Sequence, residues 1–195
     1  MHAPPALGTV QDAIFARRSV REFTGKKPDQ AVLRQLLATA VRAPTAIHEE
    51  PWRFLIVQDT ETLARISDRA KLLFADHVKQ LHLDRDNRGL AHFSRPEFNV
   101  FYNAGTLIII CARTANPFAS ADCWLAAENL MLAAHAQGLG TCVIGCAVAA
   151  LNEPELKSEL GIPEEQTAFA PIIVGTPAGE GSPSPRKPPE IIGWR

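Results

Sequence analysis

The sequence predicts an α+β fold, a three-layer α/β/α sandwich in which a mixed central sheet is flanked by helices. Helical patterns outnumber strand patterns, the apolar strand segments are widely separated, and few tight hairpin turns join them. The segment 122–137 has a helical pattern that is apolar on nearly all sides, as expected of a helix buried in such a core. Because no repeat or linker divides the 195 residues, we predict a single domain over 1–195.

The first half of the chain carries most of the expected helices. Residues 1–8 are expected to form a loose tail. Apolar periodicity then predicts helices at 9–16, 31–43 and 61–80, and an apolar run predicts a strand at 52–57. Asp29 and Thr60 stand where the second and third helices begin, and both are residue types that cap helix N-termini. Pro44 ends the second helix, and an irregular loop leads to the strand.

The second half contains most of the expected strands. They lie at 104–112, 141–145 and 169–174, with helices at 122–137 and 151–160. Asn152 is a candidate N-cap for the last helix, and His135 is interpreted as a helix-end residue rather than a ligand. The polar segment 82–98 is expected to act as a lid, and a Pro- and Gly-rich arm occupies 175–195.

The composition argues against several classes of function. The formal charge is −1, with 20 basic and 21 acidic residues, so no nucleic-acid partner is expected. No apolar run approaches the roughly 20 residues of a membrane span, and 1–8 lacks the apolar region of a signal peptide. The four cysteines lie in apolar surroundings without CxxC spacing and are interpreted as small buried residues, with no metal site. We therefore expect a cytoplasmic protein.

Residues 17–23 are the most unusual local feature. Arg17, Arg18 and Arg21 fall within five residues, together with Ser19. Guanidinium groups this close repel one another, and a bound phosphate or carboxylate would relieve the repulsion because arginine offers it a planar fork of donors. The alternative is a solvated basic surface at the end of a helix.

Further short motifs follow in a fixed order along nearly the whole chain. They are RRSVREF at 17–23, APT at 43–45, PWRF at 51–54, AAENLMLAA at 126–134, GLGTCVIG at 138–145, IIVGTP at 172–177 and RKP at 186–188. Together they resemble the nitroreductase family of FMN-dependent oxidoreductases. The resemblance implies one nitroreductase-like FMN-binding domain and a homodimer with FMN at the subunit interface.

The resemblance also implies which residues bind the cofactor. The matched positions are Arg17, Arg18, Ser19, Arg21, Pro44, Thr45, Ala46, His48, Ile144, Gly145, Arg186 and Lys187. The segment 17–21 corresponds to contacts with the phosphate, the ribityl chain and the pyrimidine edge, and the late basic pair returns to the phosphate. The backbone of Ile144 and Gly145 corresponds to the segment facing the flavin ring near N5, and the loop at 44–46 reaches across from the second subunit.

The loop after Thr45 departs from the family pattern. The family commonly has Asn and Gln before Pro-Trp, whereas this chain has AIHEE at 46–50. An ionised carboxylate can only accept hydrogen bonds, so Glu50 beside the pyrimidine edge must be turned away, protonated or paired with an arginine. His48 could replace the Asn as a donor.

The function that the resemblance implies is that of an NAD(P)H-dependent oxidoreductase of the nitroreductase type. NAD(P)H would reduce FMN at N5, and an electron-poor nitroaromatic or quinone would then take the hydride in a ping-pong cycle. Arg21 is the candidate cation beside N1. Phe93, Phe98 and Phe101 are candidates for stacking on the substrate, although for any single one an ordinary core position is the favoured interpretation.

Two other classes of function stay open on the sequence alone. The altered segment 47–50 is compatible with a flavin-storage or flavin-fragmenting protein of the same fold. A structural or partner-binding module without flavin is the second alternative, and it predicts purified protein without flavin absorbance.

Overall fold

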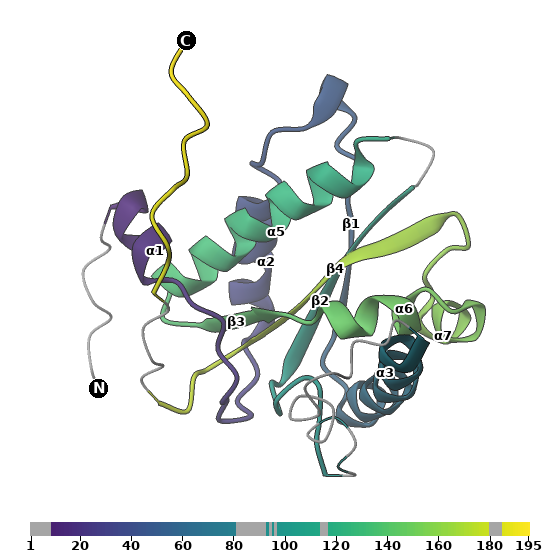
Figure 1. The fold of residues 1–195 in the computed structure, drawn as a ribbon. Coiled ribbons are helices and arrows are strands. Elements are labelled where there is room, and N and C mark those ends of the chain that lie inside the picture. Colours follow the sequence, from purple (N-terminus) through teal and green to yellow (C-terminus); the bar gives the residue numbers. More distant parts are fainter. Residues whose placement is uncertain (1–8, 81–92, 94, 96, 114–116, 180–184) are drawn as a thin grey trace.

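The computed structural model describes residues 9–80, 93, 95, 97–113, 117–179 and 185–195 (Figure 1). The helices are α1 (Val10–Ala16), α2 (Gln30–Ala40), α3 (Thr60–Gln80), α5 (Ala119–Ala136), α6 (Val148–Leu151) and α7 (Pro154–Leu160), with short 3-10 turns η1 (Ala46–His48) and η2 (Gly145–Ala147). The strands are β1 (Arg53–Val57), β2 (Thr106–Arg113), β3 (Gly140–Val143) and β4 (Gln166–Gly175). Every strand expected from the sequence is present, with its ends shifted by up to three residues.

The four strands form one sheet in the order β1-β2-β4-β3. All three neighbouring pairs are antiparallel, so the prediction of a mixed sheet is wrong for the strands that the structure describes. The parallel contribution is a single isolated bridge between Ser19 and Thr141 on β3. This bridge brings the arginine segment to the edge of the sheet.

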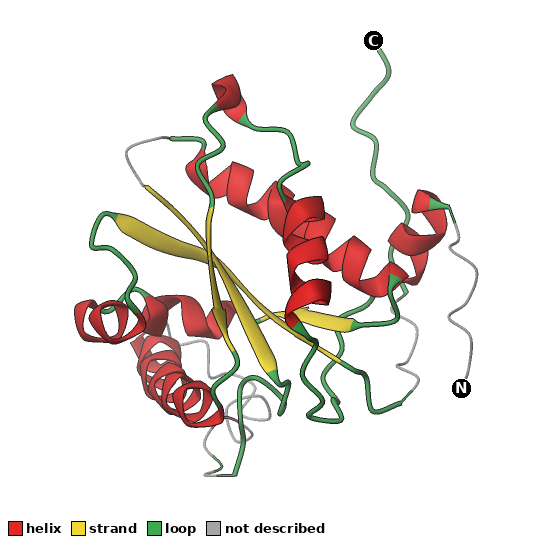
Figure 2. Cartoon of the chain, turned by 180° about the vertical axis from the view of Figure 1, so that it is seen from behind, coloured by secondary structure: helices red, strands yellow, loops and turns green. Residues whose placement is uncertain are grey.

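Side chains alternate along β2 and divide the core into two layers. Leu107 and Ile109 pack with α3 and α6, whereas Ile108 and Ile110 pack with α2 and α5, and all four are fully buried. Figure 2 shows the sheet between these two groups of helices. The predicted three-layer α/β/α architecture is therefore confirmed.

The helix α5 is the most deeply buried of the described helices. Eight of its residues are buried, and their spacing of three and four places them on one face of the helix. On the other side Trp124 and Leu125 are 40% and 45% exposed, so the prediction of a helix buried on nearly all sides is wrong. It begins at Ala119, three residues earlier than expected from the sequence. The buried set includes one acidic residue, Asp122, which lies in the first turn and is only 3% exposed.

Two of the predicted caps were wrong. The cap of α3 is Asp59 rather than Thr60, since the Asp59 carboxylate accepts from the backbone N–H and the hydroxyl of Thr62 at 2.8 Å each. These hydrogen bonds lower the pKa of Asp59 below its usual value. Asn152 caps no helix start, because it lies between α6 and α7 and its side chain bonds both backbone groups of Ala168 on β4 at 2.9 Å.

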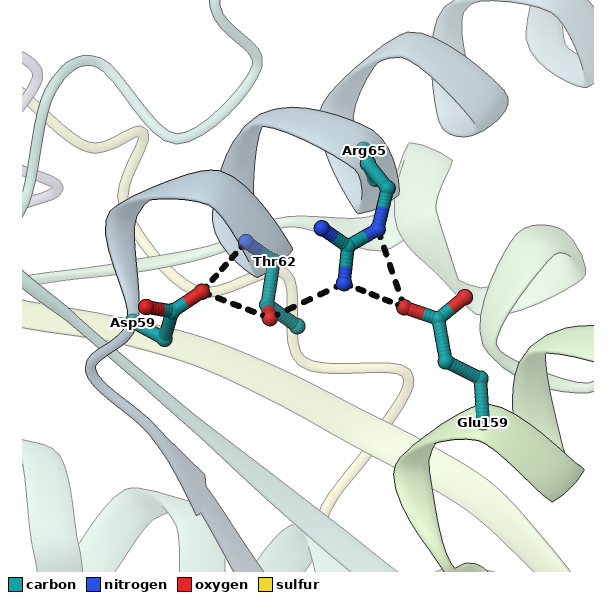
Figure 3. A network of polar contacts seen from close by, with 4 residues as sticks. All are labelled: Asp59, Thr62, Arg65 and Glu159. Atoms are coloured by element: carbon teal, nitrogen blue, oxygen red, sulfur yellow. Dashed lines mark hydrogen bonds and ion pairs between the residues drawn. The ribbon is translucent and has the colours of Figure 1, made fainter.

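A polar network next to the Asp59 cap joins α3 to α7 (Figure 3). Arg65 donates to the Thr62 hydroxyl at 3.2 Å and to a carboxylate oxygen of Glu159 at 2.9 Å. Both charged side chains are about half exposed, so the network orients the two helices but contributes little to stability. Among the described helices, none has the length and apolar character required to cross a membrane.

Candidate functional site

The arginine segment is fixed to the sheet by its backbone. The N–H of Val20 donates to the carbonyl of Thr141 on β3 at 2.9 Å, next to the bridge from Ser19. A Cβ atom on Gly140 would lie 2.9 Å from three carbons of the Val20 side chain, a distance that real Cβ atoms do not tolerate. Gly140 is therefore what allows residues 17–21 to approach β3 this closely.

The next residues continue the same attachment. Phe23 forms an antiparallel bridge with Pro177, and the N–H of Ala178 donates to the carbonyl of Glu22 at 3.0 Å. The Phe23 side chain is buried against Gly175 at the end of β4. The segment is thus held at two points along the end of the sheet, with Arg21 between them and Arg17 and Arg18 before the first.

The first arginines face α5. The Nε of Arg17 lies 3.2 Å from a carboxylate oxygen of Glu128, and the Arg17 side chain is only 20% exposed. Partial burial lowers the pKa of His135, and the nearby positive charges of Arg18 and Arg17 lower it further. Glu128 and His135 therefore mark where the arginines meet α5, and the sequence motif gave no role to Glu128.

The remaining polar groups of the segment surround Cys142 on β3. Burial raises the pKa of this thiol, and three neighbours oppose that rise: the guanidinium of Arg21, a hydrogen bond from Ser19 and the charge of Arg17. The structure therefore brings together Arg17, Ser19 and Arg21, as predicted, around the end of β3.

Arg21 also lines a hollow of about 410 Å³ with Phe98, Tyr102 and Asn103. Burial raises the pKa of the Tyr102 hydroxyl, and the guanidinium of Arg21 limits the rise through its charge and a hydrogen bond. Tyr102 and Asn103 have left-handed backbone conformations, with φ of 51° and 58°. The sequence analysis missed Tyr102, the one tyrosine of the chain.

The three predicted stacking residues have different surroundings. Phe93 and Phe98 are half-buried and in contact, with ring centroids 5.2 Å apart, and Phe98 meets the edge of Tyr102 at 5.6 Å. Phe101 is 1% exposed and belongs to the core between α3 and the sheet, so its burial contradicts a stacking role. Most of the predicted lid at 82–98 lies outside the described residues.

The segment after β3 presents backbone rather than side chains. The N–H of Ile144 already donates to the carbonyl of Pro171 at 2.9 Å, and its side chain is buried, so of the two predicted residues Ile144 offers no free donor to a ligand. The next residue, Gly145, is exposed, and a Cβ atom placed on it would meet nothing within 4 Å. Open space beside this backbone leaves room for a flat ring.

The loop at 44–50 is built differently. Ile47, His48 and Glu50 all have left-handed conformations, with φ of 48°, 59° and 45°. Such conformations are costly for residues other than glycine and persist when surrounding contacts fix them. One contact of this loop with the rest of the chain is a hydrogen bond of 3.2 Å from the N–H of Ala46 to Asp122 Oδ1 on α5.

Asp122 is a second residue that the sequence analysis missed. Its other carboxylate oxygen is buried and has no hydrogen-bond partner among the described residues. An acidic residue in the first turn of a predominantly apolar helix was the available signal. Arg186 and Lys187 lie in the exposed C-terminal segment, which both views show extending from the neighbourhood of α1 (Figures 1 and 2).

The arrangement suits a ligand that combines an anionic group with a flat polar ring. The arginines and Ser19 supply donors for the anion, and open backbone at Gly145 supplies a surface for the ring. No acid–base pair or nucleophile with a lowered pKa accompanies them in the described part of the chain, because the thiols of Cys142 and Cys146 both have raised pKa values. The residues therefore bind and orient rather than attack a substrate.

Comparison with known proteins agrees with this geometry. The family model described as "Nitroreductase family" matches residues 14–176. A protein of Archaeoglobus fulgidus, whose name combines NADH dehydrogenase and NAD(P)H nitroreductase, is 27% identical over 172 residues, which cover 86% of this chain and 84% of the relative. The NADH dehydrogenase of Thermus thermophilus is 27% identical, with both chains fully covered. A nitroreductase from Bacteroides fragilis, solved with bound FMN, superposes with a TM-score of 0.77 and 28% identity, covering 96% of this chain and 98% of that one.

Proposed function

The chain belongs to the nitroreductase family, and from this premise we propose that it is a cytoplasmic FMN-dependent oxidoreductase. It uses NAD(P)H to reduce electron-poor acceptors such as nitroaromatics or quinones. The reductant and the acceptor bind alternately, in a ping-pong cycle. The observation that carries this proposal is the convergence of Arg17, Ser19 and Arg21 on the end of β3, beside the open backbone of Gly145.

The residues present fit FMN. Arg17 and Arg18 would hold the phosphate, with Arg186 and Lys187 approaching from the C-terminal segment. Glu128 keeps the half-buried Arg17 in place through its carboxylate. Arg21 would lie beside the polar edge of the ring, and the Gly145 N–H is the candidate donor toward it. When bound, FMN supplies the two-electron redox chemistry that no side chain of this site can supply.

The hollow beside Arg21 is the proposed place for reductant and acceptor. Phe98 and Tyr102 give it aromatic walls, which favour flat substrates. The fixed charge of Arg21 would favour acceptors that gain negative charge as they are reduced. Binding of both substrates at one place explains why we expect them to alternate.

We also propose that two copies form a homodimer with FMN at the interface. Large apolar side chains are exposed on two segments that are near each other in both views: Val10 and Phe15 on α1 are 74% and 80% exposed, and Ile192 and Trp194 in the C-terminal segment are 106% and 89% exposed. Exposed side chains of this size in two neighbouring segments favour a partner surface. Light scattering at micromolar concentration should give twice the mass of one chain, and a monomer would contradict the interface site.

The decisive experiment is an anaerobic titration of the purified yellow protein. Addition of NADH or NADPH should bleach the flavin absorbance, and addition of a nitroaromatic or quinone should restore it. Protein that is yellow but not bleached by either nucleotide would support flavin storage or fragmentation instead. Protein that does not absorb in the flavin bands, even after incubation with FMN, would overturn both readings.

A further inference from the structure

A second hollow lies at the opposite end of the sheet. It has a volume of about 330 Å³ and lies between the start of β1, the end of β2 and the turn that joins α7 to β4. The hollow contains the buried residue Gln166 at the start of β4, whereas Ile144 beside the candidate flavin site bonds to Pro171, five positions further along the same strand. Roughly 17 Å of strand therefore separates this hollow from the candidate flavin site.

Three polar side chains share one face of the sheet here. Arg113 lies directly opposite Gln166, and Arg53 lies opposite Cys111, two residues before Arg113 on β2. Side chains alternate along a strand and match across a pair, so all three project to the same face. This face also carries Leu55, and both Leu55 and Ile162 line the hollow with apolar surface.

The guanidinium groups of Arg53 and Arg113 have few hydrogen-bond or ion-pair partners among the described residues. They are diagonal neighbours on adjacent strands, where like charges repel. Arg53 donates a hydrogen bond to the adjacent carbonyl of Trp52 at 2.9 Å. Arg113 meets Glu165 at 3.4 Å, with side chains 70% and 53% exposed, and an ion pair of this kind contributes little. Both guanidiniums therefore keep donors that an anion could use.

Gln166 makes the site more specific than a pair of surface arginines. Its side chain is only 6% exposed, lines the hollow, and has an oxygen, Oε1, without a hydrogen-bond partner among the described residues. A buried carbonyl oxygen without a donor is destabilising, and a ligand that donates a hydrogen bond to it would remove that cost. The hollow thus offers two cations, one acceptor and an apolar wall.

We propose that this hollow binds a small α-hydroxycarboxylate with an apolar body. The carboxylate binds Arg53 and Arg113, and the hydroxyl donates to Gln166 Oε1. Gln166 lies directly opposite Arg113, so a hydroxyl on the carbon next to the carboxylate reaches it. The apolar body rests on Leu55 and Ile162. This binding is independent of the flavin site and of the function proposed above.

Calorimetric titration of the purified protein with α-hydroxyisocaproate tests the proposal, with isocaproate as the matched acid that lacks the hydroxyl. We expect the hydroxy acid to bind at least about fivefold more tightly than isocaproate. Arg113→Gln and Arg53→Gln should each weaken both acids at least about fivefold. Gln166→Leu should abolish the difference between the acids, and Glu165→Gln should strengthen both by removing the competing carboxylate.

Arg34→Gln is the matched control, because Arg34 is an exposed arginine on α2 that lines a different hollow. It should leave both affinities unchanged. The flavin spectrum should not change when the acids bind. The proposal would be overturned if the hydroxy acid does not bind, or if its affinity is the same before and after Arg53 and Arg113 are replaced. A change in the flavin spectrum on binding would also overturn it, because it would place the acid at the flavin site.

Discussion

Residues 17–23 and the loop 44–50 are both assigned to the proposed cofactor sites, but they are held in place in opposite ways. The first segment is attached by backbone: Val20 bonds Thr141 on β3, and Phe23 bridges to Pro177. The loop has three left-handed residues, and a hydrogen bond from the Ala46 N–H to the Asp122 side chain joins it to α5. Backbone attachment tolerates changes of side chain, whereas a strained loop held by a side chain ties its geometry to that residue.

The same contrast appears in how well each region fits the family pattern. The segment 17–23 matches the family motif, whereas 46–50 departs from it. We infer that the first region holds the cofactor and that the second adjusts what approaches the cofactor. The predictions below test that division of roles, beginning with the largest expected effect.

The first prediction concerns Arg21. Arg21→Ala should weaken FMN binding by about 10- to 100-fold, because a charge-assisted hydrogen bond contributes roughly 1.5–3 kcal/mol. Fluorescence titration of the flavin-free protein with FMN measures the change. Arg34→Ala, on the exposed side of α2, is the control and should leave the affinity unchanged. Unaltered FMN affinity in Arg21→Ala would remove the arginine segment from the cofactor site.

The second prediction tests the backbone attachment itself. In Gly140→Ala the new Cβ atom would lie 2.9 Å from three Val20 carbons, so the strand and the segment must separate. We expect the free energy of unfolding to fall by about 1–3 kcal/mol, as in other overpacked sites. Denaturant unfolding measures it. Adding Val20→Ala to Gly140→Ala removes two of the three close carbons and leaves Cβ, so it should recover part of the loss. A failure of this rescue would show that the contact is not what Gly140 provides.

The third prediction concerns the loop. Asp122→Ala removes the acceptor for the Ala46 N–H and should lower the free energy of unfolding by about 1 kcal/mol. Asp122→Asn keeps an acceptor and should cost less. Hydrogen exchange at residues 46–50 should become faster in Asp122→Ala and stay close to wild type in Asp122→Asn. If both variants leave exchange unchanged, the loop is fixed by contacts other than Asp122.

The same variants separate the roles of the two regions in catalysis. Asp122→Ala should raise the KM for the acceptor more than it changes the affinity for FMN, whereas Arg21→Ala should do the reverse. Equal effects of both variants on FMN affinity would contradict the division of roles.

The accuracy of the sequence analysis follows the same contrast. Short apolar, β-branched runs located the four described strands, because the residue types that favour a strand lie within the strand itself. The relative direction of the strands depends on how the connections cross the sheet, so the prediction of a mixed sheet was wrong. Asn152 bonds Ala168, 16 residues away, and no local pattern shows such a partner.

The residues of the candidate site were likewise predicted only in part. The cluster Arg17, Ser19 and Arg21 was found because its residue types are unusual at that spacing. Glu128, Tyr102 and Asp122 were missed, since each acts through a neighbour that is distant in sequence. Phe101 was assigned a role by residue type alone, and its burial could be seen only in the packed structure.

The last and smallest effect is a dependence on pH at the arginine end of the site. Burial and the charges of Arg18 and Arg17 lower the pKa of His135 in the folded protein, whereas the unfolded chain titrates near pH 6.5. The unfolded state therefore binds more protons as the pH falls through 6.5, and folding is destabilised by at most about 1.4 kcal/mol per pH unit. His135→Gln should remove this contribution. An NMR titration should show the His135 pKa rise when FMN is added, because a phosphate beside the arginines offsets their charge. A pKa that does not change on FMN addition would place the phosphate away from Arg17 and Arg18.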